Sequence, residues 1–200
     1  YGHDDKVCAY PSLTALIAVE NPIHTTMAVL ADKEEIGSEG NSGMQSAIYF
    51  DIIADLANTL GVSEAVVRAN SKCLSSDVNA AFDPNFPEVN ERRNACFVNY
   101  GVVITKFTGA RGKSGSNDAS AEFVGYVRNV LDAAGVVWQT SELGKVDGGG
   151  GGTVAKFIAE KNVDVIDLGV PVISMHAPYE VVSKTDVYMT HKAIEAFFKA

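Results

Sequence analysis

Two adjacent carboxylates, Glu34 and Glu35, follow an apolar run over residues 27–30 that has the pattern of a strand. Such a pair is costly unless a cation compensates the two negative charges. Neighbouring residues at the end of a strand point in different directions. One carboxylate can therefore bind a metal while the other accepts a proton from a metal-bound water, a division of roles that is typical of metallohydrolases. A solvated acidic loop is the alternative for an isolated Glu-Glu pair.

Other metal-binding residue types occupy equivalent places along the chain. Asp77 follows a short strand pattern, His176 follows the apolar run over residues 170–173, and Asp4 precedes the first expected helix. In open α/β sheets ligands bind beyond the carboxyl ends of the strands, so we expect these distant residues to converge there. One His with several carboxylates is a donor set that zinc accepts, with manganese or cobalt as alternatives.

The elements that must position these residues alternate between helices and strands. Apolar residues three or four apart predict helices, and short apolar runs predict strands. The expected helices cover 7–19, 43–60, a segment opened by Ser63 as cap, 119–134, 153–161 and 186–199, and the expected strands cover 25–30, 74–77, 98–107, 136–140 and 163–168. This alternation predicts an α/β fold, a three-layer sandwich with a mixed, largely parallel central sheet.

Composition limits the classes of function. The 200 residues are 46% hydrophobic, which fits one domain with a well-packed core. The net charge of −9 argues against a nucleic-acid partner, and no apolar run approaches the roughly 20 residues that cross a bilayer, so we expect no membrane association. The three cysteines, at positions 8, 73 and 96, form no Cys-x-x-Cys pair. They are expected to be buried thiols in a reducing compartment, which favours the cytoplasm.

Five short segments carry a resemblance to a known family. They are GHDDKVCA at 2–9, EEIGS at 34–38, SSDVNA at 75–80, GGT at 151–153 and ISMH at 173–176. In this order they resemble the motifs of the aspartyl aminopeptidase family of dinuclear zinc exopeptidases. The match extends over nearly the whole chain. It implies the zinc-exopeptidase-like fold, also described as phosphorylase/hydrolase-like.

The resemblance also implies a role for each candidate residue. Asp4 would bridge two divalent metal ions, Glu35 and His176 would complete one metal site, and Asp77 would belong to the other. Glu34 would be the general base that accepts the proton of the attacking water and returns it to the departing amine. The two ions, zinc in that family, would lower the pKa of this water and polarise the scissile carbonyl.

Residues near the substrate follow from the same resemblance. Lys106 aligns with a lysine that the family places near the substrate, and Gly151 and Gly152 would form the wall of the active site. Arg111 and Lys113 share the cationic stretch of Lys106, with a solvated loop as the alternative. The glycine run at 148–152 could be mistaken for a phosphate cradle, but no Gly-Lys-Ser/Thr follows it, and a flexible linker is its other alternative.

One further residue is expected to support the metal site. Glu180 lies four residues after His176 and would hold that ligand in place, with capping or a surface role as the alternative. Asn79 and Asp83 stand where family members often have histidines near the substrate. This departure puts a strict preference for acidic substrates in doubt.

The expected function is that of a metallo-aminopeptidase that removes amino-terminal residues, Asp or Glu in that family, from peptides. A related di-metal hydrolase with broad aminopeptidase or deacylase activity is the first alternative, and a non-catalytic binding or assembly module is the second. The family has a further His ligand and a supporting Asp in a His-x-Asp motif upstream of this sequence. Residues 1–200 are therefore expected to be a single domain, the carboxyl-terminal part of a catalytic domain without its upstream segment and inserted oligomerisation domain. Assembly into a homo-oligomer, a dodecamer in the family, is implied by kinship alone.

Overall fold

A computed structural model describes residues 1–111 and 114–200, and Lys113 of the expected cationic stretch lies outside them. A four-stranded sheet forms its centre, in the order β1 (Lys72–Ser75), β7 (Asp164–Gly169), β3 (Val102–Thr105) and β6 (Trp138–Thr140). β1 runs parallel to β7 and β3 runs parallel to β6, whereas β3 and β7 are antiparallel. Two of the three pairings are thus parallel, as the predicted mixed sheet requires.

Smaller sheets extend from the central one. β2 (Asn79–Ala80), β8 (Pro171–Ile173) and β9 (Val181–Val182) form a three-stranded sheet in that order, and β4 (Phe107–Ala110) pairs with β5 (Ser114–Asp118) as a hairpin. β1 continues towards β2 through Asp77, and β7 continues directly into β8. β2 and β8 are parallel neighbours, so the chain segments that leave β1 and β7 stay side by side.

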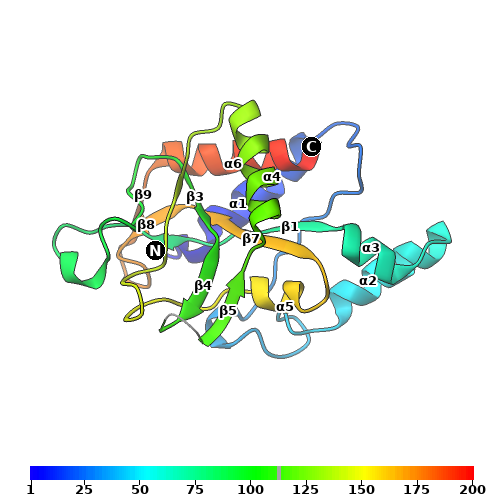
Figure 1. Cartoon of the computed structure of the whole chain (residues 1–200), viewed down its shortest axis with the longest axis horizontal. Coiled ribbons are helices and arrows are strands. Elements are labelled where there is room, and N and C mark those ends of the chain that lie inside the picture. The colour runs from blue at the N-terminus through cyan, green and yellow to red at the C-terminus, as the bar shows by residue number, and fades with distance from the viewer. Residues whose placement is uncertain (112–113) are drawn as a thin grey trace.

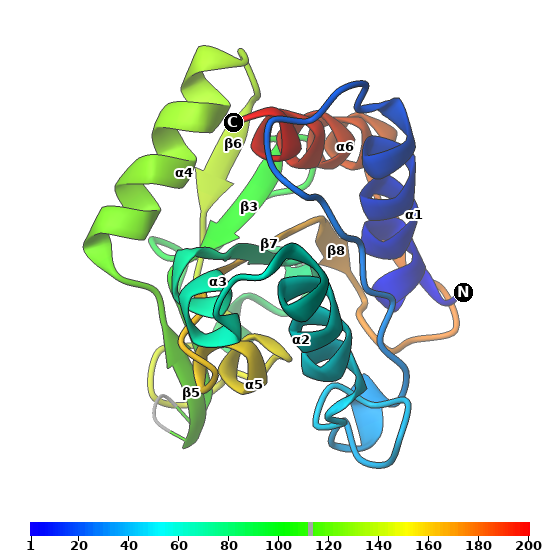
Figure 2. The same cartoon turned by 90° about the vertical axis from the view of Figure 1, so that its right-hand side faces the viewer.

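Helices cover both faces of the sheet, as Figures 1 and 2 show together. α1 (His3–Ala18), α4 (Ala121–Ala133) and α6 (Lys184–Lys199) lie on one face, and α2 (Ile48–Leu60), α3 (Glu64–Asn70) and α5 (Ala155–Ala159) lie on the other. The described residues also contain two short 3₁₀ turns, Glu34–Ile36 and Pro87–Val89. The three-layer α/β sandwich predicted from the alternation of elements is confirmed.

The main core lies between the sheet and the helices α1, α4 and α6. Its fully buried members include Ile104 of β3, Ile166 and Leu168 of β7, and Val127 and Leu131 of α4. All four residues of β3 are buried, because this strand is covered on both faces. The core therefore fixes β3 and β7, the central strands of the sheet.

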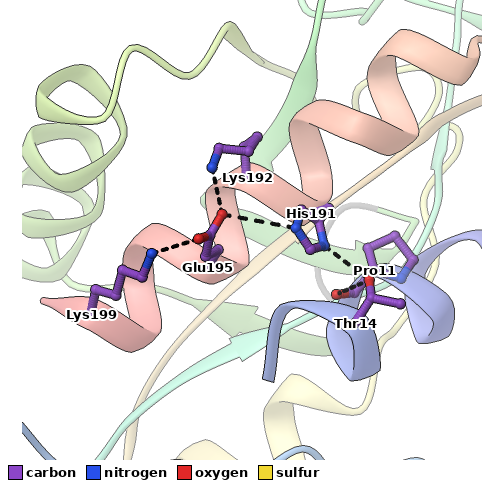
Figure 3. A network of polar contacts seen from close by, with 6 residues as sticks. All are labelled: Pro11, Thr14, His191, Lys192, Glu195 and Lys199. Carbon is purple, nitrogen blue, oxygen red and sulfur yellow. Dashed lines mark hydrogen bonds and ion pairs between the residues drawn. The ribbon is translucent and has the colours of Figure 1, made fainter. Parts of the chain in front are cut away.

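A polar network joins the first helix to the last (Figure 3). Glu195 of α6 accepts hydrogen bonds from Lys192 and Lys199, and its carboxylate lies 3.8 Å from Nε2 of His191. Nδ1 of His191 lies 2.9 Å from the hydroxyl of Thr14 in α1. The network places His191 in the packing between α1 and α6.

Two sequence predictions need correction. Residues 25–30 do not form a strand, and the side chains of Met27 and Leu30 are exposed. A strand needs a neighbour that completes its hydrogen-bond ladder, and within the described residues the bridge between Asp32 and Gly43 is the nearest such pairing. The helix expected over 43–60 begins only at Ile48, since residues 43–47 form turns. None of the described helices combines the length and the apolar composition needed to traverse a bilayer.

Candidate metal centre

Asp4 lies at the start of α1, where its backbone is not yet helical. Glu180, in the loop before β9, holds this start in place: its Oε2 accepts the backbone N–H groups of His3 at 2.7 Å and Asp4 at 3.3 Å. A carboxylate near the first turn of a helix is favourable because the exposed amides carry partial positive charge. The Asp4 side chain is 10% exposed, so its negative charge is largely shielded from water.

Glu34 and Glu35 lie in a tight 3₁₀ turn instead of at the end of a strand. Lys33 precedes the turn with φ of 63° and Gly37 follows it with φ of 94°, both left-handed conformations. The N–H of Gly37 bonds the carbonyl of Glu34 at 3.0 Å and closes the turn. The turn thus fixes the backbone that presents both carboxylates.

His176, Asp4 and Glu35 meet in one place. Nε2 of His176 lies 2.8 Å from Oδ2 of Asp4 and 3.0 Å from Oε1 of Glu35. Burial and the Glu35 carboxylate raise the pKa of Asp4, and the two carboxylates outweigh burial and raise the pKa of His176. The backbone of His176 is left-handed, with φ of 66°, as is that of Ser174 at 61°. Such conformations are uncommon outside glycine and occur often at functional sites.

A second group shares Asp4 with the first. Carboxylate oxygens of Asp4, Asp5 and Asp77 lie within 4.8 Å of one another. Burial, followed by the charge of Asp77, raises the pKa of Asp5 to about 9, and burial, followed by the charge of Glu34, raises the pKa of Asp77 to about 8. Asp5 was not among the predicted ligands. Its position beside Asp4 at the start of a helix was the sequence signal, but that position is equally typical of an acidic residue at a helix terminus.

The two groups fit divalent cations. Oδ1 of Asp5 is buried and has no hydrogen-bond partner among the described residues. Several carboxylates this close repel one another, and a cation between them would remove that repulsion. One imidazole nitrogen with carboxylate oxygens is a donor set used for zinc. Because Asp4 belongs to both groups, it is the residue that could bridge two ions.

A cleft of about 810 Å³ opens onto these groups. It brings together the five predicted catalytic and metal-binding residues and the two glycines of the predicted wall, namely Asp4, Glu34, Glu35, Asp77, His176, Gly151 and Gly152. Phe86, Val89, Leu143 and Met175 give the cleft an apolar side. Within residues 1–111 and 114–200, no Lys or Arg lines it. The volume suits a ligand of the size of a few amino-acid residues.

Lys106 and Glu180 have different surroundings. Lys106 does not line the cleft in the described part of the chain, and its ammonium forms an ion pair with Asp118 of β5. Glu180 touches the site through the backbone: Oε1 accepts the N–H of His176 at 2.8 Å, while Oε2 binds the start of α1. Glu180 therefore holds together the two segments that carry His176 and Asp4.

Comparison with known proteins identifies the family. Residues 1–198 match the family of aminopeptidase I zinc metalloproteases (M18). The chain belongs to the M18 family. This confirms the resemblance drawn from the five motifs. A probable M18 family aminopeptidase 1 of Clostridium acetobutylicum is 48% identical over 201 residues, which are 98% of this chain and 43% of the relative. A probable M18 family aminopeptidase 1 of Thermotoga maritima is 44% identical over 204 residues, which are 100% of this chain and 45% of the relative.

Solved M18 structures have the same fold. The crystal structure of aminopeptidase I from C. acetobutylicum superposes with a TM-score of 0.93 at 47% identity, over 100% of this chain and 44% of that one. The M18 aminopeptidase structure from T. maritima superposes with a TM-score of 0.95 at 44% identity, over 100% of this chain and 45% of that one. The sequence thus spans less than half the length of these M18 relatives.

Proposed function

We propose that the whole protein carrying this chain is a zinc aminopeptidase that hydrolyses the amino-terminal peptide bond of its substrates. The observation that carries the proposal is the convergence of His176, Glu35 and Asp4 at 2.8 to 3.0 Å around the imidazole, with Asp77 in an overlapping group. Membership in a family of zinc metalloproteases supports the choice of zinc. The shared position of Asp4 supports two metal ions.

Each residue has one task in this proposal. His176 and Glu35 would hold one zinc, Asp77 would help to hold the other, and Asp4 would contribute to both sites. Zinc, when bound, supplies Lewis-acid activation of a water molecule and of the scissile carbonyl. Glu34 lines the cleft beside these ligands and accepts the proton of the attacking water, then returns it to the leaving amine. Burial and the carboxylates of Glu35 and Asp4 raise the pKa of Glu34, which suits a base that must also release its proton.

The glycines at 151 and 152 are proposed to face the substrate backbone, since they line the cleft and have no side chains that would narrow it. Glu180 is proposed to keep the backbones of His176 and Asp4 at a fixed separation. Supporting residues of this kind tune metal affinity without touching the metal.

Two substrate preferences are in competition. A preference for Asp or Glu at the amino terminus rests on the family resemblance, with Lys106 as the residue that would pair with the acidic side chain. A broader aminopeptidase specificity is favoured by the lining of the cleft, which offers apolar side chains and, within the described residues, no cation. Lys106 is already paired with Asp118. We therefore propose the broad specificity as the second candidate.

Assembly and location are further parts of the proposal. The solved structure of a yeast relative is a dodecamer, and a homo-oligomer is proposed for the whole protein by kinship. A cytoplasmic location is proposed because Cys8, Cys73 and Cys96 are free thiols in the structure.

The test is made on the whole natural protein and a Glu34→Gln variant. Metal content is measured by mass spectrometry, and turnover is measured on Asp-, Glu- and Leu-naphthylamide. Removal of a general base is expected to lower kcat by about 10²–10⁴-fold. The metal content should stay at two zinc ions per chain, since Glu34 is not a ligand in this proposal.

The outcomes separate the candidates. Faster turnover of the Asp and Glu substrates supports the acidic preference, and faster turnover of the Leu substrate supports the broad one. Fewer than two metals with no turnover would support a non-catalytic module. A Glu34→Gln protein with full metal and full turnover would remove Glu34 as the base.

A further inference from the structure

Asp167 is a buried carboxylate outside the metal groups described above. It lies on β7, opposite Ser75 of β1 and Thr105 of β3, and it is 5% exposed. Neither of its carboxylate oxygens has a hydrogen-bond partner in the described part of the chain. It belongs to neither group of clustered metal-ligand atoms. An uncompensated buried charge is strongly unfavourable, and the side chains that shift the pKa of this carboxylate are polar groups without a positive charge.

The surroundings of Asp167 are rich in oxygen. Burial raises the pKa of Asp167 to about 6, and the polar side chains of Thr153, Ser75, Asn117 and Thr108, which face the carboxylate, partly offset this rise. The hydroxyls of Ser75 and Thr108 and the amide nitrogen of Asn117 are themselves buried without hydrogen-bond partners among the described residues. These groups are therefore gathered around the carboxylate without closing onto it.

A small cavity accounts for this spacing. Its volume is about 20 Å³, and Asp167, Thr108, Thr153, Asn79 and Asp77 are among its walls. One water-sized particle needs about 10–15 Å³, so the cavity accommodates a single particle. The carboxylate of Asp167 and the hydroxyls of Thr108 and Thr153 would contact this particle instead of one another.

We propose that this cavity binds one dehydrated alkali cation, Na⁺ or K⁺, with Asp167 as its charged ligand. The donor set is a carboxylate with the hydroxyl oxygens of Thr108 and Thr153, and it contains no imidazole or thiolate, which zinc favours. Mg²⁺ usually keeps several of its waters, and a cavity of one particle has no room for them. A single carboxylate charge matches a monovalent ion.

A bound water is the competing occupant. Water would satisfy hydrogen bonds but would leave the negative charge of Asp167 buried and uncompensated. Asp77 also lines the cavity, but its charge belongs to the metal group that it forms with Asp4 and Asp5. A cation in the cavity would therefore compensate the charge of Asp167.

The site would connect the sheet to the wall of the cleft. Thr153 directly follows Gly151 and Gly152, which line the cleft, whereas Asp167 and Ser75 belong to the central sheet. Thr108 and Asn117 pair across the β4–β5 hairpin. One ion would thus tie the glycine-rich loop and the hairpin to β7 of the central sheet. This inference does not depend on the proposed peptidase activity.

The test measures thermal unfolding of the whole natural protein in choline chloride, into which NaCl or KCl is titrated at constant ionic strength. A cation that binds only the folded state should raise Tm with the logarithm of its concentration once that exceeds its Kd, by about 5 °C or more at a hundred times its Kd. Crystals soaked in a rubidium or thallous salt should show an anomalous peak between Asp167 and Thr153.

Matched variants locate the effect. Asp167→Asn keeps the shape but removes the charge and should abolish the alkali dependence of Tm. Asp164→Asn changes an exposed residue of the same strand and should keep that dependence in full. If Asp167→Asn does not fold, Thr108→Val removes one oxygen and should weaken the apparent alkali affinity by about tenfold.

Equal Tm in choline, sodium and potassium, with water in place of an anomalous peak, would overturn the proposal. An equal alkali response in natural protein, Asp167→Asn and Thr108→Val would overturn it as well, because the cation would then bind elsewhere.

Discussion

The backbones of Gly169 and Asp77 lie so close that a β-carbon on Gly169 would come 1.7 Å from the Asp77 carbonyl oxygen. Gly169 ends β7 and pairs with Val103 of β3, so the hydrophobic core holds it in place. The segment with Asp77 is therefore positioned directly by the central sheet. Only glycine permits this approach.

Gly169→Ala should displace Asp77 and weaken the metal site. The overlap must be relieved by a backbone shift, and overpacking of this kind costs about 1–3 kcal/mol of stability. We expect a lower Tm and less than the natural zinc content per chain, measured by calorimetry and mass spectrometry. Gly125→Ala in α4 is the control, since an added β-carbon there meets nothing within 4 Å. The control should be as stable as the natural protein or slightly more stable. Natural zinc content in Gly169→Ala would contradict the prediction.

Glu180→Gln should weaken zinc binding without removing a ligand. The carboxylate accepts three backbone N–H groups, from His176, His3 and Asp4, whereas an amide has one oxygen and a nitrogen that cannot accept. Loss of such support typically lowers metal affinity by about 10–100-fold. A chelator competition titration of the whole protein measures this affinity. Glu122→Gln, at an exposed position of α4, is the matched control and should leave it unchanged. Equal affinities in the two variants would mean that Glu180 has no role at the metal site.

The outline of the fold was predictable because its helices and strands have clear periodicity. The helix expected over 119–134 corresponds to α4, which Ser120 caps by accepting the N–H of Phe123. The strand expected over 25–30 failed because strand formation depends on a neighbouring strand, and a sequence pattern does not reveal whether that neighbour is present.

The metal-binding residues were predictable in type but not in geometry. Spacing suggested that Asp77 and His176 follow strands, and the family motifs assigned their roles. The burial of Asp5 and Asp167 left no local signal, because an isolated Asp in sequence looks the same whether it is solvated or enclosed. The family resemblance assigned Lys106 to the surroundings of the substrate, and nothing in the sequence indicated its ion pair with Asp118.

Asp186→Ala should destabilise the fold and leave the metal centre intact. The buried carboxylate of Asp186, at the start of α6, accepts the backbone N–H of Asn99 at 2.6 Å and of Gly101 at 2.8 Å. Loss of both bonds leaves these N–H groups without their acceptor, at about 3 kcal/mol. Calorimetry should show a clearly lower Tm, with zinc content unchanged. Asp186→Asn keeps one acceptor oxygen, so its stability should fall by about half as much as that of Asp186→Ala. Loss of zinc in Asp186→Ala at temperatures below unfolding would show that the contact of Asp186 with Asn99 and Gly101 also supports the metal centre.

Glu195→Gln should remove a stabilising effect that depends on pH. Hydrogen bonds from Lys192 and Lys199 lower the pKa of Glu195 from 4.5 to about 2 (Figure 3). A carboxylate with a lowered pKa in the folded state stabilises the fold above its unfolded pKa, and this contribution is lost as the pH falls through the folded pKa. The natural protein should therefore have a Tm about 2–4 °C above that of Glu195→Gln near neutral pH, for a network contribution of about 1 kcal/mol. The difference should shrink as the pH falls from 4.5 to about 2. Glu160→Gln, at an exposed position after α5, should show no such difference at any pH. A Tm difference between the natural protein and Glu195→Gln that stays constant down to pH 2 would contradict this prediction. It would mean that packing against α1, and not the charge of Glu195, provides the stabilisation.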